Sequence, residues 1–484
     1  MLAKLIESDS PVPQGAGALP IAGITADSRQ VRPGFLFAAL PGVKVDGARF
    51  IPQAVQAGAA AVLCPPGVEV PPPAVTVAAA NPRRMLALMA ARFSGAQPDL
   101  VVAVTGTNGK TSIASFVRQI WASMGFRAAS LGTIGVVGPE GEEYLAHTTP
   151  DPVTLHATLA RLAADHVTHL ALEASSHGLD QYRLDGVRLS AGAFTNITRD
   201  HLDYHPSFEA YFDAKMRLFE DLLPAGAPAV VNMDSPHGAE VARRARAHGL
   251  TVLGVGEAGD WLRVISIMRD GFGQRLKVDA PGGRHEISLP LAGEFQASNA
   301  LIAAGLVIAT GGEESLAMHA LESLKGARGR LDLAGTSRAG APIFVDYAHT
   351  PDALQTALLA LRPYVAGKLV VVFGAGGDRD KGKRPQMGAV AAKFADRAYV
   401  TDDNPRSEVP AAIRAEIMAA CPGGIEIGDR ATAIRTAIEG LGAGDVLLVA
   451  GKGHEPGQTV GQEVLPFSDH DAVAAGIRGE DYHG

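Results

Sequence analysis

The stretch VTGTNGKT, residues 104–111, has the residue types and spacing that bind phosphate. A glycine-rich turn between a strand and a helix presents backbone N–H groups to phosphate oxygens, Lys110 can reach the terminal phosphates, and the Thr111 hydroxyl can bind Mg²⁺. Val104 stands where the common form of this loop has its first glycine. A strand, a glycine turn, Lys-Thr and a helix follow in order. The pattern therefore predicts a phosphate-binding loop rather than an ordinary strand–helix turn.

A second chemical group, Glu173, ends the apolar run at the start of HLALEASSHG, residues 169–178. In a parallel sheet, ligands bind at the carboxyl ends of the strands, so we expect Glu173 to point into the same crevice as Lys110. A carboxylate there would complete the oxygen shell of Mg²⁺.

Two further segments allow more than one interpretation. TRDHLDYH, residues 198–205, places two acids and two histidines within a few positions, including His201. This pattern suits a polar loop or a metal site. Lys215, in YFDAKMRLF, is on local evidence a solvated lysine on an amphipathic helix.

Near the end of the chain, TDDNPRSEVP (401–410) follows an apolar run and combines carboxylates, an amide and a guanidinium. Its first proline disfavours helix for the preceding residue, so Asn404 and Arg406 should project from a loop. AGKGHE (450–455) also follows a strand, and its Gly451 and Glu455 should face the same crevice.

The glycine-rich stretch GAGGDRDKGKRP (374–385) suggests a dinucleotide-binding loop. Arg379 occupies the third glycine position of that motif. We therefore interpret the stretch as a basic anion-binding loop after a strand.

The elements that must position these residues form an α/β pattern. Apolar runs alternate with helical segments from about residue 100, which predicts a parallel sheet with crossover helices. A helix is expected over 81–93, followed by a linker at 94–98. After a loop-like stretch at 326–342 the pattern restarts with five strands and four helices, typical of a doubly wound sheet.

Composition limits the classes of function. The 484 residues suggest about three domains, and 47% hydrophobic content is enough for several cores. The net charge, 43 − 51 = −8, argues against a nucleic-acid-binding protein, which normally has a basic face.

The cysteines and the apolar segments indicate the compartment. Cys64 and Cys421 match no metal spacing and predict no disulfide framework. The start lacks the apolar core of a signal peptide, and the apolar stretch 300–310 is too short to span a bilayer. We expect a soluble cytoplasmic protein.

Taken together, the motifs resemble a known family. TGTNGKT, EASSHGLDQYR, TNITRDHLDYH, YFDAKMRLF, FQASNALIA, GRLD, VDYAHTPDAL and GKGHE, in that order, resemble the Mur ligases of bacterial cell-wall synthesis. The N-terminal TADSRQVRPGFLFAALPGVKVDGARFI resembles the branch that adds the third residue of the stem peptide, and DNPR the members that add meso-diaminopimelate. The resemblance covers essentially the whole chain.

This resemblance implies three domains. They are a small N-terminal α/β domain that binds the UDP-sugar (1–95), a central P-loop ATPase domain with a mainly parallel sheet (96–330), and a C-terminal Rossmann-like domain that binds the amino acid (331–484). The implied reaction is ATP-dependent amide formation between UDP-N-acetylmuramoyl-L-alanyl-D-glutamate and meso-diaminopimelate, through an acyl phosphate. Mg²⁺ is the implied cofactor, and nothing demands more than a monomer.

The resemblance also assigns residues. To ATP it gives Thr105, Gly106, Thr107, Asn108, Gly109, Lys110, Thr111, Asn299, Arg330 and Asp346. To metals it gives Thr111, Glu173, His201 and Lys215 as a carbamate, which reverses the local interpretation of Lys215; Lys110, His201 and Lys215 are the implied catalytic residues. To the UDP-sugar peptide it gives Ser28, Val43, Lys44, Val45, Thr148, Thr149, Ser175, Gln181 and Arg183. To the amino acid it gives Arg379, Asp403, Asn404, Pro405, Arg406, Gly451 and Glu455.

Three alternatives stay open at this point. A folylpolyglutamate synthase shares the GTNGKT style but should lack the N-terminal domain. The lysine-adding ligase of the same branch is excluded only by Arg406 and its loop. A nucleotide-dependent switch would bind ATP without releasing phosphate in response to both co-substrates.

Overall fold

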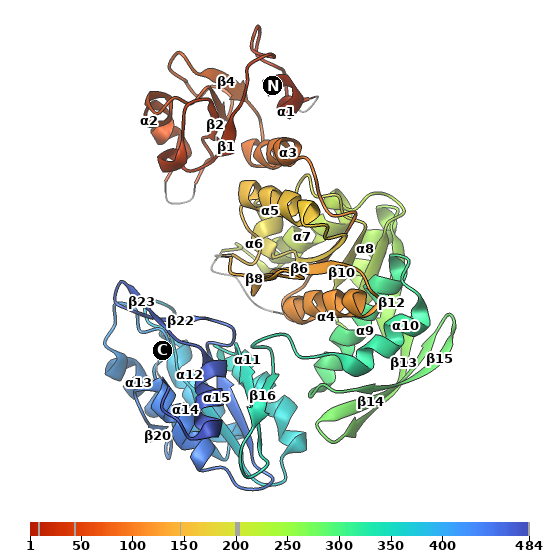
Figure 1. The fold of residues 1–484 in the computed structure, drawn as a ribbon, viewed down its shortest axis with the longest axis vertical. Coiled ribbons are helices and arrows are strands. Elements are labelled where there is room, and N and C mark those ends of the chain that lie inside the picture. Colours follow the sequence, from red (N-terminus) through yellow and green to blue (C-terminus); the bar gives the residue numbers. More distant parts are fainter. Residues whose placement is uncertain (8–9, 43–44, 146, 199–203, 483–484) are drawn as a thin grey trace. The chain divides into compact units, whose positions relative to one another are not determined.

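The computed structural model describes residues 1–7, 10–42, 45–145, 147–198 and 204–482 (Figure 1). The chain divides into two compact units. The first comprises Met1–Val264, Asp279–Gly283 and Leu301–Ala317, and the second comprises Ile265–Val278, Arg284–Ala300 and Met318–Gly484. Within the described residues, no helix is long and apolar enough to cross a membrane. The expected limits of three domains remain a prediction.

The first sheet of unit 1 is small and parallel. Its strands, in spatial order, are β1 (Gly23–Thr25), β2 (Phe35–Ala38), β3 (Ala61–Cys64) and β4 (Val75–Ala78). The associated helices are α1 (Leu2–Ile6), α2 (Ile51–Gln56) and α3 (Pro82–Ser94). The expected helix over 81–93 is confirmed. The Asn81 side chain caps it by accepting from the Arg84 N–H, and Pro82 suits its first turn.

The central sheet has eleven strands in the order β15-β14-β13-β12-β11-β10-β5-β9-β6-β7-β8. Their bounds are β5 (Leu100–Thr105), β6 (Ala128–Gly132), β7 (Gly135–Gly138), β8 (Gly141–Glu143), β9 (His169–Glu173), β10 (Ala191–Phe194), β11 (Pro228–Asn232), β12 (Thr251–Gly256), β13 (Leu262–Asp270), β14 (Gly273–Ala280) and β15 (Gly283–Leu289). The pairs from β12 to β6 are parallel, whereas β6–β7 and β7–β8 are antiparallel.

Helices follow the strands of this sheet along the chain. They are α4 (Lys110–Ser123), α5 (Pro152–Ala164), α6 (Ser176–Asp180), α7 (Phe208–Arg217), α8 (Gly238–Ala247), α9 (Glu294–Ala309) and α10 (Glu314–Ala320). Val101 and Ala103 of β5 pack into one core with α5, α7 and α8. Strand β5 pairs with β9 so that Val104 lies opposite Glu173. The ends of these two strands, and the groups that follow them, therefore meet at one edge of the sheet.

The third sheet lies in unit 2, in the order β16-β17-β21-β18-β19-β20. Its strands are β16 (Asp332–Thr336), β17 (Pro342–Asp346), β18 (Leu369–Phe373), β19 (Arg397–Val400), β20 (Ile425–Glu426) and β21 (Val446–Ala450). All neighbours are parallel except β16, which runs antiparallel to β17. The five expected strands are confirmed, and β16 is an addition to them.

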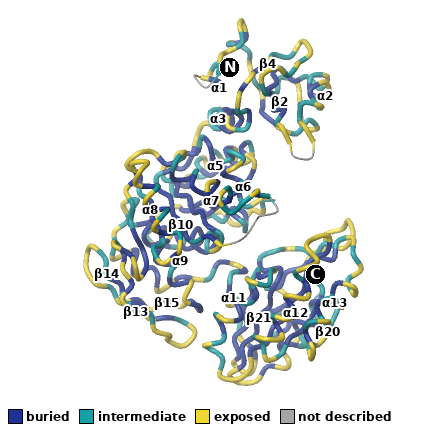
Figure 2. Tube along the Cα trace, turned by 180° about the vertical axis from the view of Figure 1, so that it is seen from behind, coloured by how far each residue is buried: buried dark blue, intermediate teal, exposed yellow. Residues whose placement is uncertain are grey.

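Helices cover both faces of this sheet, which is the doubly wound arrangement expected. They are α11 (Pro351–Leu361), α12 (Lys383–Phe394), α13 (Pro410–Met418), α14 (Arg430–Glu439) and α15 (Asp469–Arg478). Val371 and Phe373 of β18 pack with α11, α12 and α13, whereas Val370 and Val372 pack with α14 and α15. Because successive strand residues face opposite sides, a strand buried on both faces is apolar throughout. Figure 2 shows the strands of this sheet as its buried interior.

The sequence analysis missed the antiparallel hairpins. Strands β7, β8 and β13–β15 were not expected, and neither was the pair β22 (Gly457–Val460) and β23 (Glu463–Pro466). Both β8 and β23 are exposed along their length. Such strands lack the continuous apolar run on which the prediction depended.

Candidate active site

The predicted phosphate loop lies between β5 and α4, as expected. Gly106 has φ of +147°, and a Cβ added there would lie 1.9 Å from Thr195 Oγ1, so this position requires glycine. Gly109 adopts a left-handed conformation immediately before Lys110 begins the helix. Lys110 Nζ folds back to donate to the carbonyl oxygens of Gly106 and Thr107, at 2.8 Å each. The side chain is thus held over the turn whose N–H groups begin the helix.

The loop is held from its other side by residues that the sequence analysis did not single out. Thr195 Oγ1 donates to the carbonyl of Asn108 at 2.6 Å, and Asn196 Oδ1 accepts from the Asn108 N–H at 3.0 Å. The hydroxyls of Thr107 and Tyr211 lie 3.0 Å apart. These hydroxyls and the amide belong to the segments TNIT (195–198) and YFDAK (211–215), and they support the loop.

The local interpretation of Lys215 as a solvated lysine is wrong. The residue is 1% exposed, and its Nζ donates to the Gly106 carbonyl at 2.8 Å, so α7 carries it into the loop. Its ammonium also lies 4.5 Å from the centre of the Tyr211 ring. An amphipathic pattern shows which face of a helix is apolar, but only the packed fold shows that a long cation on its margin is enclosed. His201, its expected companion, lies outside the described residues.

Glu173 lies at the end of β9 and is 1% exposed. Its carboxylate accepts from the Thr133 N–H at 2.8 Å and from the Thr133 hydroxyl at 3.0 Å. The Thr111 hydroxyl is 3.5 Å from that of Thr133, and Thr111 and Glu173 both line a small cavity of about 20 Å³. The fold therefore brings the two expected Mg²⁺ ligands to one place. No group of three His, Cys, Asp or Glu suited to a metal occurs among the described residues.

Gly132, at the end of β6, sets the position of this carboxylate. A Cβ added at Gly132 would lie 2.0 Å from Glu173 Oε1, so the Gly132→Ala substitution must displace the Glu173 side chain. We expect the kcat of the ATP-dependent reaction that the resemblance implies to fall about 10²-fold, because displacing a group at a reacting site by about 1 Å has that effect. The Mg²⁺ concentration needed for half-maximal rate should rise as well.

The matched control for this substitution is Gly138→Ala in β7, where an added Cβ would meet only Ala129 Cβ at an ordinary 3.5 Å. Steady-state kinetics across a Mg²⁺ titration measures both variants. Equal activity of the two variants would contradict a metal-binding role for Glu173.

The residues expected to hold the muramoyl dipeptide also cluster beyond β9. Thr149 Oγ1 donates to the Glu173 carbonyl at 2.8 Å and accepts from the Ser175 N–H at 3.1 Å and from the Ser175 hydroxyl at 3.0 Å. Arg183 donates to the Thr149 carbonyl at 2.6 Å and to Gln181 Oε1 at 2.8 Å. The Thr148 hydroxyl is 3.0 Å from that of Thr133. All five residues thus belong to one hydrogen-bonded group next to Glu173.

The expected uridine contacts are less defined. Ser28 lies in a short 3₁₀ turn after β1 and is 3.5 Å from Gln53 Oε1. Val45 is 44% exposed. Val43 and Lys44 lie outside the described residues.

In unit 2, three residues expected near ATP are connected to one another. Asn299 Nδ2 donates to Gln296 Oε1 at 3.1 Å, and Gln296 Nε2 donates to the Arg330 carbonyl at 3.2 Å. Asp346, at the end of β17, accepts from the Leu331 N–H at 2.6 Å. The Arg330 guanidinium lies 4.7 Å from the centre of the Tyr347 ring.

The loops after β19 and β21 meet, as their positions at strand ends predicted. Asn404 Nδ2 donates to Glu455 Oε2 at 2.8 Å. A Cβ added at Gly451, where φ is +117°, would lie 2.6 Å from Asp403 Oδ2, so glycine lets the two loops approach. Burial raises the pKa of Asp403, but Lys452 and Arg430 outweigh it and hold that pKa below its ordinary value. The loops therefore present an ionised carboxylate.

The glycine-rich loop after β18 contacts the loop after β19, which in turn meets the loop after β21. Arg406 Nη1 donates to the Gly377 carbonyl at 2.9 Å, and the Gly377 N–H donates to the Asn404 carbonyl at 2.9 Å. A Cβ added at Gly377 would lie 2.0 Å from the Pro405 carbonyl oxygen. The Arg379 side chain, in the same loop, is exposed. The seven residues expected to bind the amino acid are thus carried by three adjoining loops.

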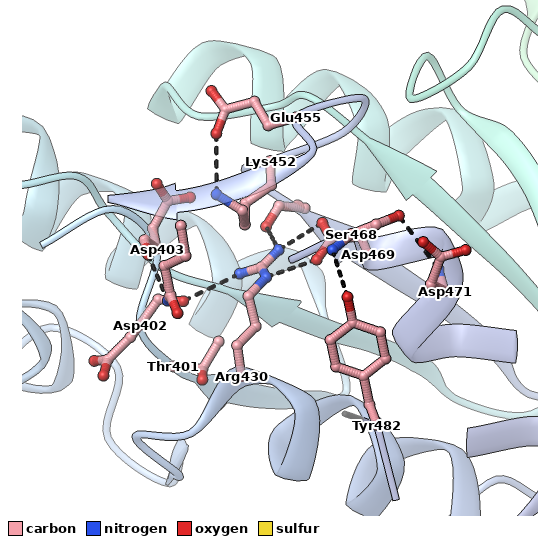
Figure 3. Close-up of polar contacts among 12 residues, drawn as sticks. Thr401, Asp402, Asp403, Arg430, Lys452, Glu455, Ser468, Asp469, Asp471 and Tyr482 are labelled. Atoms are coloured by element: carbon pink, nitrogen blue, oxygen red, sulfur yellow. Dashed lines mark hydrogen bonds and ion pairs between the residues drawn. The ribbon is translucent and has the colours of Figure 1, made fainter. Parts of the chain in front are cut away.

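Two buried arginines that the sequence analysis missed support these loops. Arg430 forms a bidentate pair with Asp469, at 2.7 and 2.8 Å, with both side chains fully buried (Figure 3). Arg430 also donates to the Ala450 carbonyl at 2.9 Å. Arg384, fully buried, donates to Glu408 at 2.9 and 3.1 Å. No local signal identifies such pairs, because the partners are separated by 39 and 24 residues.

The Glu408 carboxylate predicts an acid-dependent stability. Hydrogen bonds from Arg384 lower its pKa from 4.5 to about 2. A lowered folded-state pKa stabilises the fold above the unfolded-state pKa, and this stabilisation is lost as the pH falls toward the folded-state value. The difference in free energy of unfolding between wild type and Glu408→Gln should therefore be constant above about pH 5 and shrink below pH 4.5.

Urea denaturation at a series of pH values measures this difference. Glu439→Gln, at the exposed end of α14, is the control. A difference that stays constant down to about pH 3 would contradict the assignment.

Family models match three successive parts of the chain. Residues 20–96 match "Mur ligase family, catalytic domain", residues 104–307 match "Mur ligase middle domain", and residues 329–453 match "Mur ligase, glutamate ligase domain".

Individual proteins match nearly the whole chain. A UDP-N-acetylmuramoyl-L-alanyl-D-glutamate–2,6-diaminopimelate ligase of Bradyrhizobium diazoefficiens is 57% identical over 483 residues, which cover 98% of this chain and 99% of the relative. A solved structure of a ligase with the same name is 31% identical, with a TM-score of 0.72, and covers 97% of each chain. Mycobacterium tuberculosis folylpolyglutamate synthase, at 18% identity and a TM-score of 0.61 over 76% of this chain and 92% of its own, shares the fold alone. The chain belongs to the Mur ligase family.

Proposed function

We propose that this ligase joins diaminopimelate to the D-glutamyl γ-carboxylate of UDP-N-acetylmuramoyl-L-alanyl-D-glutamate at the expense of ATP. The observation that carries the proposal is the meeting of Asp403, Asn404, Arg406 and Glu455 at the ends of β19 and β21. Diaminopimelate has an amine and a carboxylate at each end. A guanidinium and carboxylates on adjoining loops match such an end, and a bidentate grip by Arg406 suits its carboxylate. The name of the 57%-identical relative agrees with this substrate.

Binding of ATP is assigned to the loop from Thr105 to Thr111 and to Asn299, Arg330 and Asp346. The N–H groups at the start of α4 and the Lys110 ammonium suit phosphate oxygens. Thr111 and Glu173 offer two hard oxygen ligands beside a small cavity, which fits Mg²⁺, an ion that keeps several waters and substrate oxygens in its shell. When bound there, the ion would offset negative charge on the phosphates.

The reaction proceeds in two steps. The γ-phosphoryl group leaves the β-phosphate oxygen of ATP and bonds to an oxygen of the D-glutamyl γ-carboxylate, which gives ADP and an acyl phosphate. Lys110 offsets charge on the transferred group. The amine of diaminopimelate then bonds to the acyl carbon, the bond from that carbon to the phosphate oxygen breaks, and the amine loses a proton. The products are an amide and inorganic phosphate.

Substrate placement completes the proposal. Thr148, Thr149, Ser175, Gln181 and Arg183 would hold the dipeptide next to Glu173, and the N-terminal segment with Ser28 and 43–45 would hold the uridine nucleotide. Lys215 acts as a carbamate and His201 as a second metal ligand. Native mass spectrometry of the intact chain tests the carbamate as a gain of one carbon dioxide that Lys215→Met abolishes. Dependence on ATP and two buried free cysteines suit a cytoplasmic enzyme.

The decisive experiment measures ATP-dependent phosphate release with UDP-N-acetylmuramoyl-L-alanyl-D-glutamate, and compares meso-diaminopimelate with L-lysine as acceptor. Turnover with diaminopimelate alone would support the ligase and its acceptor. Turnover with lysine instead would keep the ligase and overturn the role of Arg406. No phosphate release with either acceptor would favour a nucleotide-dependent switch, and release with a folate and glutamate would favour a folylpolyglutamate synthase.

A further inference from the structure

Lys452, the lysine of AGKGHE, lies directly after β21 and is fully buried. Its Nζ donates to Asn404 Oδ1 at 3.0 Å and to Glu455 Oε2 at 3.0 Å. Figure 3 shows the ammonium between the loop that carries Asp403 and the Glu455 carboxylate. Burying an ammonium costs free energy unless it is paired. Lys452 is paired with two residues proposed to bind the amino acid, Asn404 and Glu455, and this indicates that it affects amino-acid binding.

The first effect of Lys452 is on the orientation of Asn404. The same oxygen that accepts from Lys452 also accepts from the Thr459 N–H at 2.9 Å. Both partners can only donate, so the atom between them must be the carbonyl oxygen of the amide and not its nitrogen. The Asn404 NH₂ group therefore faces Glu455, to which it donates at 2.8 Å. Lys452 thus helps to fix the orientation in which the Asn404 NH₂ group donates to Glu455.

The second effect is on charge. Lys452 acts electrostatically on Asp403, and it forms an ion pair with Glu455. The other cation that acts strongly on Asp403 is Arg430, whose charge is already matched by the buried Asp469 carboxylate. Arg430 acts electrostatically on Glu455 as well, but its own ion pair is with Asp469, whereas Lys452 forms its ion pair with Glu455 itself. Without Lys452, the Glu455 carboxylate would lose its ion-pair partner and Asp403 the cation that acts most strongly on it, so the site would become more anionic.

We infer that Lys452 is a positioning residue that makes this site selective for an acceptor whose distal end carries a carboxylate as well as an ammonium. This inference rests on the proposed function. An anionic site would attract the single distal ammonium of lysine and repel the distal carboxylate of diaminopimelate. Lys452 balances charge on the two acids and holds the Asn404 NH₂ toward Glu455, so that the site can accept one ammonium and one carboxylate together.

The test compares Lys452→Met, which removes the charge at similar volume, with Lys452→Gln, which keeps a hydrogen-bond donor without the charge. Lys368→Met is the matched control, because Lys368 is an exposed lysine of the same unit. Phosphate release is measured on the full chain with meso-diaminopimelate and with L-lysine, and kcat and KM are determined separately for each acceptor.

We expect Lys452→Met to lower the ratio of kcat/KM for diaminopimelate over lysine at least about tenfold, mainly through a higher KM for diaminopimelate. Lys452→Gln should lower this ratio less, and Lys368→Met should leave it unchanged. In a Glu455→Gln background the effect of Lys452→Met should shrink, because the two residues act as a pair.

A purely structural role would lower kcat/KM for both acceptors by the same factor, and this outcome would overturn the inference. Thermal unfolding of each variant shows whether it folds. If Lys452→Met does not fold, the ratio measured for Lys452→Gln decides between the two roles. Failure of the proposed function is recognised separately, since the wild type would then turn over neither acceptor.

Discussion

Lys110→Met is expected to lower kcat about 10²- to 10³-fold while binding of the acceptor amino acid changes little. Lys110 begins α4, and its ammonium donates to the carbonyls of Gly106 and Thr107 at 2.8 Å, so it lies directly over the loop. Negative charge develops on the departing β-phosphate oxygen in the transition state, and a fixed cation that reaches the β- and γ-phosphates stabilises it more there than in the ground state. The effect should therefore appear in kcat.

Phosphate release at saturating substrates measures this loss. Lys4→Met, an exposed lysine of α1, is the matched control and should retain full activity. Lys110→Arg keeps the charge in a different geometry and should recover only part of the rate. A Lys110→Met variant with wild-type kcat would remove this lysine from the reaction.

The second large effect is expected from Arg406→Met. We expect kcat/KM for diaminopimelate to fall roughly 30- to several-thousand-fold, which corresponds to the about 2–5 kcal/mol lost when one partner of a close charge pair is truncated. For lysine, which has no distal carboxylate, kcat/KM should change by less than about threefold. The substitution would therefore reduce discrimination between the two acceptors.

The geometry of Arg406 supports this expectation. Its backbone has φ of +50°, an uncommon conformation for arginine, and β22 with the turn that follows it holds the residue there. The Arg406 N–H donates to the Thr459 carbonyl at 3.0 Å, and the Gly461 N–H donates to the Arg406 carbonyl at 2.7 Å. Only Nη1 of the guanidinium is hydrogen-bonded within the described chain, so Nε and Nη2 remain as an edge for a carboxylate.

Competition between the two acceptors in one reaction, read by mass spectrometry of the products, measures the discrimination. Arg406→Lys keeps the charge but not the bidentate fork, and should fall between wild type and Arg406→Met. Arg478→Met, an exposed arginine at the end of α15, is the control. Unchanged discrimination in Arg406→Met would show that the distal carboxylate binds elsewhere.

Much of the fold was predictable because its core strands are buried on both faces. Leu100–Thr105 and Leu369–Phe373 are continuous apolar runs, and each is followed by a glycine-containing turn and a helix. Such runs predict parallel strands with crossover helices. Their carboxyl ends then predict where Lys110, Glu173, Asn404 and Glu455 lie, because parallel strands end at a common edge.

The sequence by itself thus determined the α/β class, the strands that carry the chemistry and the motifs at their ends, since these depend on local pattern and chain order. The tertiary structure decided which polar side chains are enclosed. Lys215 and Lys452 are both buried, although lysine on a helix margin or in a glycine-rich loop is ordinarily solvated. Their burial depends on partners 109 and 48 residues away, Gly106 and Asn404, and only the folded chain brings such partners together.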